Sequence, residues 1–362
     1  MKYINTFKTH ASYESELNVG GVDFKIPNVS YCKDVNDVHF NPYNLIKFYV
    51  GEITTETSQT VSIYTDKTNH LDVTVNEGKK WYTYVLPKVK GLCKIEGDSV
   101  KNVVIKANMA NYNVDNSGGL FPSSIIEASF KGSNTSNVTY MNYMFDGCYN
   151  LTSLDVSNFD TSKVTTMDSM FQDCTSLTSL DVSNFNTSNV TNMNNMFYNC
   201  NSLTSLTLSN FNTSNATSMG SMFEKCNSLT SLDVSNFDTS NVTNMASMFS
   251  SCSGLASLDL SNFNTSNVIN MHHMFSSCPG LTSLDLSKFD TRKVTYMHNM
   301  FYGCSRLTSL DLSGWDTSNV TSMDRMFEGC SNSLKIRMKG CNQTTIQNIT
   351  NVKPSGATIV TE

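Results

Sequence analysis

Eight cysteines recur at a fixed spacing of 26 residues, and this spacing constrains the fold more than any other feature of the chain. They occupy positions 148, 174, 200, 226, 252, 278, 304 and 330. The residues around them repeat as well, as the segment from Leu229 to Cys252 illustrates: LTSLDVSNFDTSNVTNMASMFSSC. A fixed period of about 20 to 50 residues is typical of solenoids, in which each coil buries its apolar face only by stacking on its neighbours. The sequence therefore predicts a repeat solenoid.

A single repeat indicates how each coil folds. Leu229, Leu232 and Val234 have the LxxLxL spacing of a leucine-rich strand, with the three side chains pointing into the coil. The polar segment that follows has the Asx and Ser/Thr chemistry of a tight turn. Four later residues fall at i, i+3, i+4 and i+7, the spacing of one helix face, and they are Met245, Met248, Phe249 and Cys252. We therefore predict a parallel leucine-rich-repeat β-solenoid with short helical turns.

The rest of the chain predicts further regions around the repeats. Short β-branched and aromatic runs near the N-terminus predict a small all-β domain with an anchoring role, and Leu71–Val75 with Trp81–Val85 predicts a hairpin within it. A short polar helix and a final strand at 358–360 are expected to close the far end of the stack, because terminal coils need caps. The predicted regions are 1–100 for the β domain, 101–137 for the N-terminal cap, 138–330 for the eight repeats and 331–362 for the C-terminal cap.

Composition narrows the classes of partner and chemistry. A net charge of -6 disfavours nucleic acid, which needs basic surfaces, and no run approaches the roughly 18 apolar residues that a membrane span requires. The opening MKYINTFKTH lacks the apolar stretch of a signal peptide, so classical secretion is disfavoured and assembly in a cytoplasm is expected. No CxxC pair occurs, which favours buried reduced thiols. No phosphate loop or nucleophile arrangement is recognisable, so we expect no enzyme and no cofactor.

The repeats resemble the BspA-like leucine-rich repeats of bacterial surface proteins. The resemblance rests on the 26-residue pattern LxxLDxSxFxTSxVxxMxxMFxxC and covers the chain from Val138 to Cys330. The departures from the pattern are Ala216 in place of Val, Thr207 in place of Asp and Trp315 in place of Phe. This resemblance implies a right-handed solenoid with short helices and an adhesive or interaction role. It supplies no catalytic residues.

A second resemblance concerns the segment IPNVSYCKDVNDVHFNP, from Ile26 to Pro42. It is similar to a leader found in virion proteins of phages that infect gut Bacteroidetes, including crAss-like phages. This similarity implies a virion-associated protein whose N-terminal region contacts other virion proteins and whose repeats contact a host-surface glycan or protein. The alternatives are a BspA-like adhesin on a bacterial cell surface and a purely structural virion component.

Two sets of outward residues are candidates for contact with a partner. The first set lies after the Met, Phe and Cys positions, where the repeats differ most, and aromatic and Arg side chains carry most of the energy at interfaces. The second set is a column of aspartates on the predicted sheet, which calcium could bridge or which flanking hydroxyls and water could solvate. The first set is Tyr198, His272, His298, Tyr302, Arg306 and Arg325, and the second is Asp155, Asp181, Asp233, Asp259, Asp285 and Asp311.

Two histidines and an aspartate share one position in successive repeats. His272, His298 and Asp324 each follow the first Met of the predicted helical turn, and His273 is the next residue along. Stacking would bring these side chains to within about 5 Å of each other per coil, and imidazole and carboxylate groups bind transition metals. No fourth ligand is evident, so we expect a chance surface cluster and no functional metal.

Overall fold

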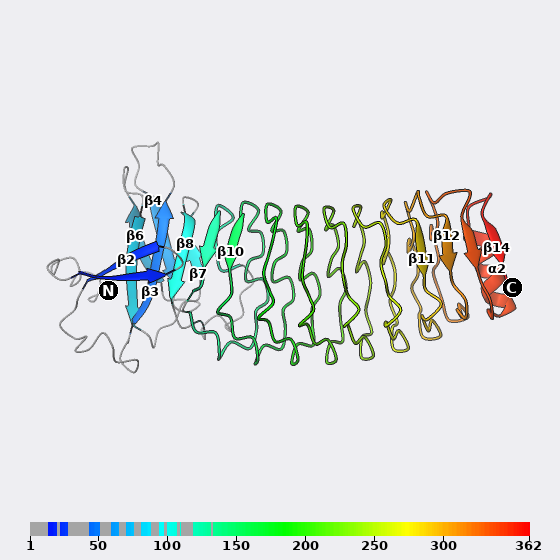
Figure 1. Ribbon diagram of the computed structural model, residues 1–362, viewed down its shortest axis with the longest axis horizontal. Helices are drawn as coiled ribbons and strands as arrows, with labels where there is room; N and C mark the ends of the chain where they lie inside the picture. Colours follow the sequence, from blue (N-terminus) through cyan, green and yellow to red (C-terminus); the bar gives the residue numbers. More distant parts are fainter. Residues whose placement is uncertain are drawn as a thin grey trace.

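The computed structural model describes residues 14–19, 22–27, 43–50, 59–64, 70–75, 81–87, 94–97, 100–106, 109, 119–131 and 133–362. The repeats form a parallel β-solenoid whose coils stack side by side along the long axis (Figure 1). At one position of each coil, parallel bridges join residues 26 apart, beginning with Tyr140 and ending at Ser322. The predicted solenoid is therefore confirmed.

The N-terminal strands are antiparallel and belong to three sheets. β1 pairs with β2, β4 pairs with β5 and β7, and β3 pairs with β6 and β8. The predicted hairpin between β5 and β6 is wrong, since these two strands lie in different sheets. The alternation of apolar and polar residues identified the two strands but not their partners, since β5 pairs with β4 and β6 pairs with β3. The bounds are β1 Glu14–Val19, β2 Val22–Pro27, β3 Tyr43–Val50, β4 Gln59–Tyr64, β5 His70–Val75, β6 Trp81–Pro87, β7 Lys94–Glu96 and β8 Val100–Lys106.

One sheet continues from the N-terminal strands into the first coils. β8 pairs antiparallel with β3 on one side and parallel with β9 (Glu127–Ser129) on the other. β9 then pairs in parallel with β10 (Ser153–Asp155), so that the five strands follow the order β10-β9-β8-β3-β6. The pairing changes from antiparallel to parallel at β8, which covers the edge that the first coil would otherwise expose.

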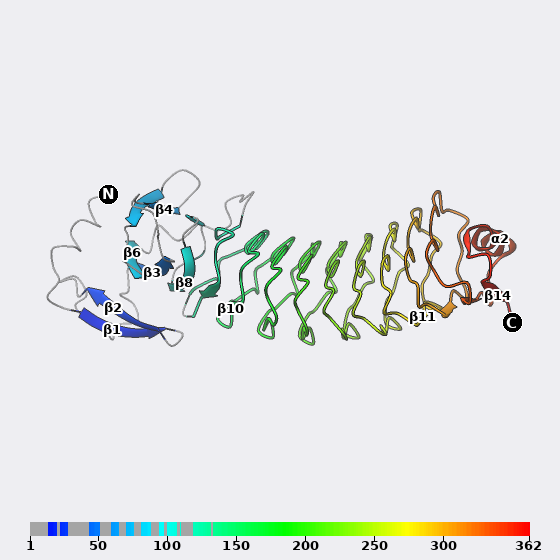
Figure 2. The same ribbon diagram turned by 90° about the horizontal axis from the view of Figure 1, so that it is seen from above.

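The leucine-rich segments form a second parallel sheet near the C-terminus. It contains β11 (Ser283–Asp285), β12 (Ser309–Asp311), β13 (Lys335–Arg337) and β14 (Thr358–Val360). The register pairs Leu284 with Leu310 and Leu310 with Ile336, and these three side chains are buried. In Figure 2, β10 and β11 lie along the same edge of the rod. The equivalent residues of the coils between them are not regular strand.

The segment predicted as a short helical turn is instead a run of tight turns. Ser247 and Ser251 adopt left-handed φ angles of 56° and 59°, which an α-helix does not allow. The backbone N–H groups of Ser247, Phe249 and Ser251 donate to carbonyls of the next coil, at 2.9, 3.0 and 2.7 Å. Because the next coil takes these donors, they are not available for bonds within a helix. The prediction of a helical turn was therefore wrong for the backbone conformation. The prediction of which side chains point inward was correct, since Met245, Met248, Phe249 and Cys252 are all buried.

The interior of the solenoid consists of columns of identical side chains. The Phe rings from Phe145 to Phe327 stack with centroids 5.3 to 5.9 Å apart and planes within 13° of parallel. Beside them, the Sγ of each repeat cysteine from Cys174 to Cys330 donates to a Phe carbonyl of the preceding coil, as Cys252 does to Phe223 at 3.0 Å. The described cysteines are all free thiols. These columns are the shared core that no single coil could form alone.

A helix and a last strand cover the C-terminal end of the stack (Figure 1). α2 (Gln343–Val352) is capped by Asn342, whose side-chain oxygen accepts a 2.7 Å bond from the Thr345 N–H. The buried Thr345 hydroxyl in turn accepts from the Thr317 N–H at 2.9 Å, and Ile349 is fully buried. β14 pairs in parallel with β13. The expected polar helix and final strand are thus both present. No helix among the described residues has the length and hydropathy of a membrane span.

Candidate functional site

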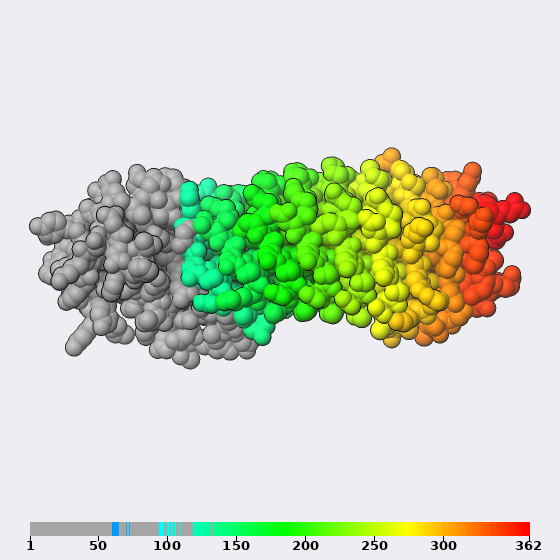
Figure 3. Space-filling model, turned by 60° about the horizontal axis from the view of Figure 1, so that its bottom comes forward, coloured from blue at the N-terminus to red at the C-terminus, as the bar shows by residue number. Residues whose placement is uncertain are grey.

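Two outward surfaces of the coils carry the candidate residues, and we name them by their positions in the coil of Cys278. The turn face comprises the outward residues of 272–280 and their equivalents, and the strand face comprises those of 282–287 and their equivalents. Successive coils form contiguous bands along the rod in the space-filling view (Figure 3). Equivalent side chains of neighbouring coils can therefore lie next to one another along either face.

None of the six predicted residues of the turn face is buried. Arg306 and Arg325 are exposed, and the other four are half-buried. Tyr198 already has a partner in its own chain, because Lys225 Nζ donates to its hydroxyl at 2.5 Å and lies 4.7 Å from its ring centroid. This hydrogen bond raises the pKa of the Lys225 ammonium. Arg325 approaches the Glu328 carboxylate at 3.5 Å. The six residues are distributed along the rod, and only His272 and His298 contact each other.

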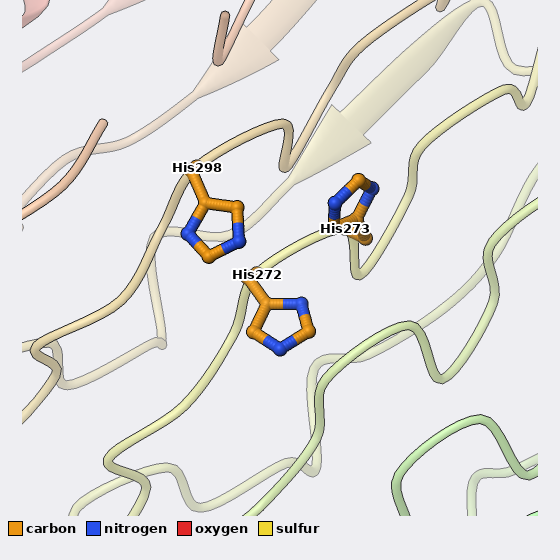
Figure 4. Close-up of side chains that lie close together, drawn as sticks. All are labelled: His272, His273 and His298. Carbon is orange, nitrogen blue, oxygen red and sulfur yellow. The ribbon is translucent and has the colours of Figure 1, made fainter. Parts of the chain in front are cut away.

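Three histidines form a compact cluster on the turn face (Figure 4). The rings of His272 and His298 stack with centroids 4.7 Å apart, and His273 stands edge-on to both at 5.4 Å. One nitrogen of each ring lies within 4.8 Å of a nitrogen of the other two. Among the described residues, these three histidines are the one group of three or more potential metal ligands whose ligand atoms lie close together. His273, which the sequence placed only as a neighbour, is therefore a full member of the cluster.

The left-handed backbone at His273 explains why two consecutive residues point to the same place. His273 has a φ of 56°, and the equivalent residues of the other repeats, such as Ser247 and Asn299, share this conformation. The His273 N–H donates to the His298 carbonyl at 3.0 Å, which joins the two coils at the cluster. The signal for this geometry in the sequence was the frequency of Ser and Asn at this position, since short polar residues tolerate the left-handed region.

The environment of the cluster favours the neutral form of two of its histidines, because it lowers the pKa of His272 and of His273. Partial burial, followed by the neighbouring His298 and His273, lowers the pKa of His272. Partial burial and His298 likewise lower the pKa of His273. The Nδ1 atom of His272 is buried and has no hydrogen-bond partner, whereas Nε2 of His273 lies 3.2 Å from the Asn299 side-chain nitrogen. Asp324, the predicted third member, is exposed and lies outside the cluster, with a 3.3 Å bond from the Ser322 hydroxyl.

The aspartates of the strand face accept hydrogen bonds within their own coils. Asp233 and Asp259 each accept from the backbone N–H two residues ahead, at 3.0 and 2.9 Å, and the other four predicted aspartates do the same. These bonds and those from the neighbouring Ser hydroxyls lower the pKa of Asp233 and Asp259. Asp311 is also 3.3 Å from the Arg337 guanidinium. Flanking groups of the chain thus donate hydrogen bonds to these carboxylates.

A pocket at the junction of β4, β7 and the first coil offers little for catalysis. It is lined by residues that include Ser62, Lys94, Glu96 and Phe121. The Glu96 carboxylate is 2.6 Å from Lys94 Nζ, and this bond is the largest contribution to its lowered pKa. A carboxylate held ionised by a lysine is a poor proton donor at neutral pH.

The repeat cysteines are equally unsuited to chemistry. Burial raises the pKa of Cys200 and Cys252 to about 12. The thiolate is the reactive form, so these thiols are inert at neutral pH.

Fold and surface together are consistent with a repeat protein of the surface or interaction class, whose coils present side chains along two faces, and no catalytic group stands out among the residues that the structure describes. The chain matches the family described as "Mycoplasma protein of unknown function, DUF285" at residues 120–232, 179–278 and 217–339. These matches cover more than half of the chain, which therefore belongs to this family of repeat proteins, and the match is consistent with BspA-like repeats. Comparisons with curated proteins and with solved structures found no match.

Proposed function

We propose that this chain is a non-enzymatic interaction protein that binds its partner through the turn face. The observation that carries the proposal is the unequal variety of the two faces. Strand-face residues repeat almost unchanged from coil to coil, whereas turn-face positions hold Tyr, His, Arg, Lys, Gln and Glu in different coils. A folded protein or a branched glycan needs a varied surface for specific contact. Tyr302, Arg306 and Arg325 are the aromatic and Arg groups best suited to such contact.

The proposed setting is a phage particle that contacts its host. In this setting the N-terminal region binds other virion proteins and the repeats bind a host-surface glycan or protein, without nucleic acid and without membrane insertion. The resemblance of the segment Ile26–Pro42 to virion leaders supports it, and most of that segment lies outside the described residues. A second setting is an adhesin on a bacterial cell surface, which the BspA-like repeat pattern and the bacterial family description support. A virion component that binds no host ligand is the third.

Binding by matched variants tests the turn face directly. The double variant Tyr302→Ser with Arg306→Gly copies Ser276 and Gly280, the equivalent residues of the preceding coil. Both substitutions are therefore residues that the fold already accepts at these positions. The control is Asp233→Thr with Asp259→Thr, which copies Thr207 on the strand face. We expect the first variant to lose binding of the labelled chain to intact host cells and to a glycan array, and the control to retain it. The reverse result would assign binding to the strand face.

A separate experiment distinguishes the settings. Mass spectrometry of purified phage particles should detect peptides of this chain, and antibody labelling of uninfected bacteria should not. Labelling of intact uninfected cells, with no peptides in particles, would establish the adhesin instead. Peptides in particles without any binding to cells or glycans would identify a structural virion component.

A further inference from the structure

We propose that His272, His273 and His298 form a binding site for one divalent transition-metal ion on the turn face. The three imidazoles converge from two adjacent coils, with one nitrogen of each within 4.8 Å of the others. Imidazole ligands select borderline ions such as Zn²⁺, Co²⁺, Ni²⁺ and Cu²⁺ over Ca²⁺ and Mg²⁺, which prefer oxygen. This site is independent of the partner proposed above, since it concerns what the chain itself binds.

The distances are close to those of a metal site. Bonds of about 2.0–2.1 Å in a tetrahedral arrangement place ligand nitrogens about 3.3 Å apart. The nitrogens here need to close by about 1.5 Å at most, which rotation of half-buried side chains can provide. The backbone does not need to move, because His273 is bonded to the His298 carbonyl at 3.0 Å and Ser247 to the His272 carbonyl at 2.9 Å. A rigid backbone beneath adjustable rings is the support that such a site requires.

One polar atom at the cluster lacks a partner that a metal would supply, and a neighbouring amide is placed to orient a ligand ring. The buried Nδ1 of His272 has no hydrogen-bond partner, and a buried polar atom left in this state is costly. An ion bound at this nitrogen would remove the cost. Asn299 lies 3.2 Å from Nε2 of His273. With its amide turned over, Asn299 would accept the Nε2–H and orient the ring to coordinate through Nδ1, as outer partners of metal-bound histidines commonly do.

The coordination would be open on one side. Asp324, the nearest equivalent of the cluster residues in the next coil, lies outside the group of ligand atoms. Three protein ligands with a fourth position for water or an outside ligand are typical of accessible zinc sites rather than closed structural ones. The site is therefore expected to bind and release its ion without unfolding the chain.

Other repeats provide the same backbone without the three ligands. Asn194, Asn195 and Gly220 occupy the equivalent positions three coils nearer the N-terminus, with Asn195 in the same left-handed conformation. Each histidine can therefore be replaced by a residue that the fold already accepts at that position. The matched triple variant is His272→Ala, His273→Ser and His298→Asn, which copies Ala246, Ser247 and Asn194.

Calorimetric titration of the full chain with Zn²⁺ tests the proposal. We expect one ion per chain at the cluster and no such site in the triple variant. Each single substitution should lower the affinity by at least about 10-fold, since the loss of a ligand costs no less than the loss of one of its outer partners. Co²⁺ should give the visible absorption of nitrogen coordination in the unchanged chain and not in the triple variant. Zn²⁺ should raise the melting temperature of the unchanged chain alone. A triple variant that binds Zn²⁺ as tightly as the unchanged chain would overturn the proposal.

A relocated site provides a second, independent test. Ala246→His and Ser247→His, combined with His298→Asn, rebuild the arrangement one coil earlier around His272. We expect this variant to bind Zn²⁺ within about 10-fold of the original affinity, because the coils share one backbone geometry. A folded relocated variant that binds no better than His298→Asn alone would contradict the claim that these three positions make the site.

Discussion

On the strand face, each aspartate side chain accepts a hydrogen bond from the backbone two residues ahead, as Asp233 does from Ser235 at 3.0 Å. On the turn face the backbone itself bonds to the next coil, as the Phe249 N–H does to the Met274 carbonyl at 3.0 Å. The aspartate side chains of the first face therefore stabilise the backbone of their own coil. On the second face the stack is held by main-chain bonds, to which only some coils add a side-chain pair such as Lys225 with Tyr198. A repeat protein can vary its surface where main-chain bonds between coils do not depend on the identity of the side chains.

The largest effect should come from the layer directly beneath the turn face. Phe249 is fully buried and stacks at 5.8 Å on Phe223 and at 5.9 Å on Phe275. Phe249→Ala should lower the free energy of unfolding by about 3–5 kcal/mol, measured by denaturant titration, because it leaves a cavity in the column. Tyr302→Ser, on the surface above the same kind of column, should change it by less than about 0.5 kcal/mol. Similar losses in both variants would erase the distinction between core and turn face.

A smaller loss should follow from the buried threonine at the corner between the faces. The Thr239 hydroxyl donates to the Asn264 carbonyl at 2.9 Å and accepts from the Asn264 N–H at 2.8 Å. Thr239→Val keeps the shape but leaves both backbone groups without a partner, so we expect a loss of about 1–3 kcal/mol in thermal or chemical unfolding. Thr243→Val, an exposed position on the same coil, is the control. A neutral Thr239 variant would mean that water replaces the hydroxyl.

The left-handed turns should be improved slightly by glycine. Ser251 has a φ of 59°, and Gly303 occupies the equivalent position with a φ of 72°. Ser251→Gly relieves about 1–2 kcal/mol of steric cost and adds about 0.5–1 kcal/mol of entropy loss, so the melting temperature should rise a little. Ser250→Gly, the neighbouring residue without a positive φ, should lower it. A fall in both variants would show that the entropy loss of glycine outweighs the relief of steric cost at the turn.

The strand face should respond to acid through its aspartates. Hydrogen bonds from Ser and backbone N–H groups lower the pKa of Asp181, Asp233 and Asp259 below the usual 3.8. Because the folded pKa is depressed, the stabilisation is present above pH 3.8 and is lost as the pH falls through the lower folded pKa. Melting temperature measured from pH 6 to pH 2.5 should therefore fall at the acid end. Replacing all three by Asn, which keeps an acceptor without titrating, should flatten this slope, and an unchanged slope would assign it to other carboxyl groups.

The period and the apolar pattern were sufficient to predict the solenoid and its inward residues. Leu232, Val234 and Phe249 are buried as their spacing required. The backbone of the Met–Phe–Cys segment was not predictable in the same way, because the spacing i, i+3, i+4, i+7 fits both a helix turn and a run of tight turns. Hydrogen bonds between coils decide in favour of the tight turns, as the bond from the Ser247 N–H to the His272 carbonyl shows. The acceptor of this bond lies in the next coil, so the pattern of a single repeat does not reveal it.

The candidate site was predictable only in part for the same reason. The shared position of His272 and His298 follows from the period alone, and their stacking confirms it. The inclusion of His273 depends on a left-handed residue that turns its side chain toward the same place. Asp324, although in register, lies outside the cluster because register fixes the Cα position and not the direction of the side chain.

The 26-residue register also has a genetic consequence. Each coil contacts only the coil before it and the coil after it, through bridges such as Asn244 to Asn270 and stacked rings such as Phe249 on Phe275. Unequal recombination between near-identical repeats would remove or add one whole coil and leave every junction chemically intact. The number of coils should then change more readily during evolution than the sequence of a coil. Related strains should therefore differ first in how many coils the chain contains.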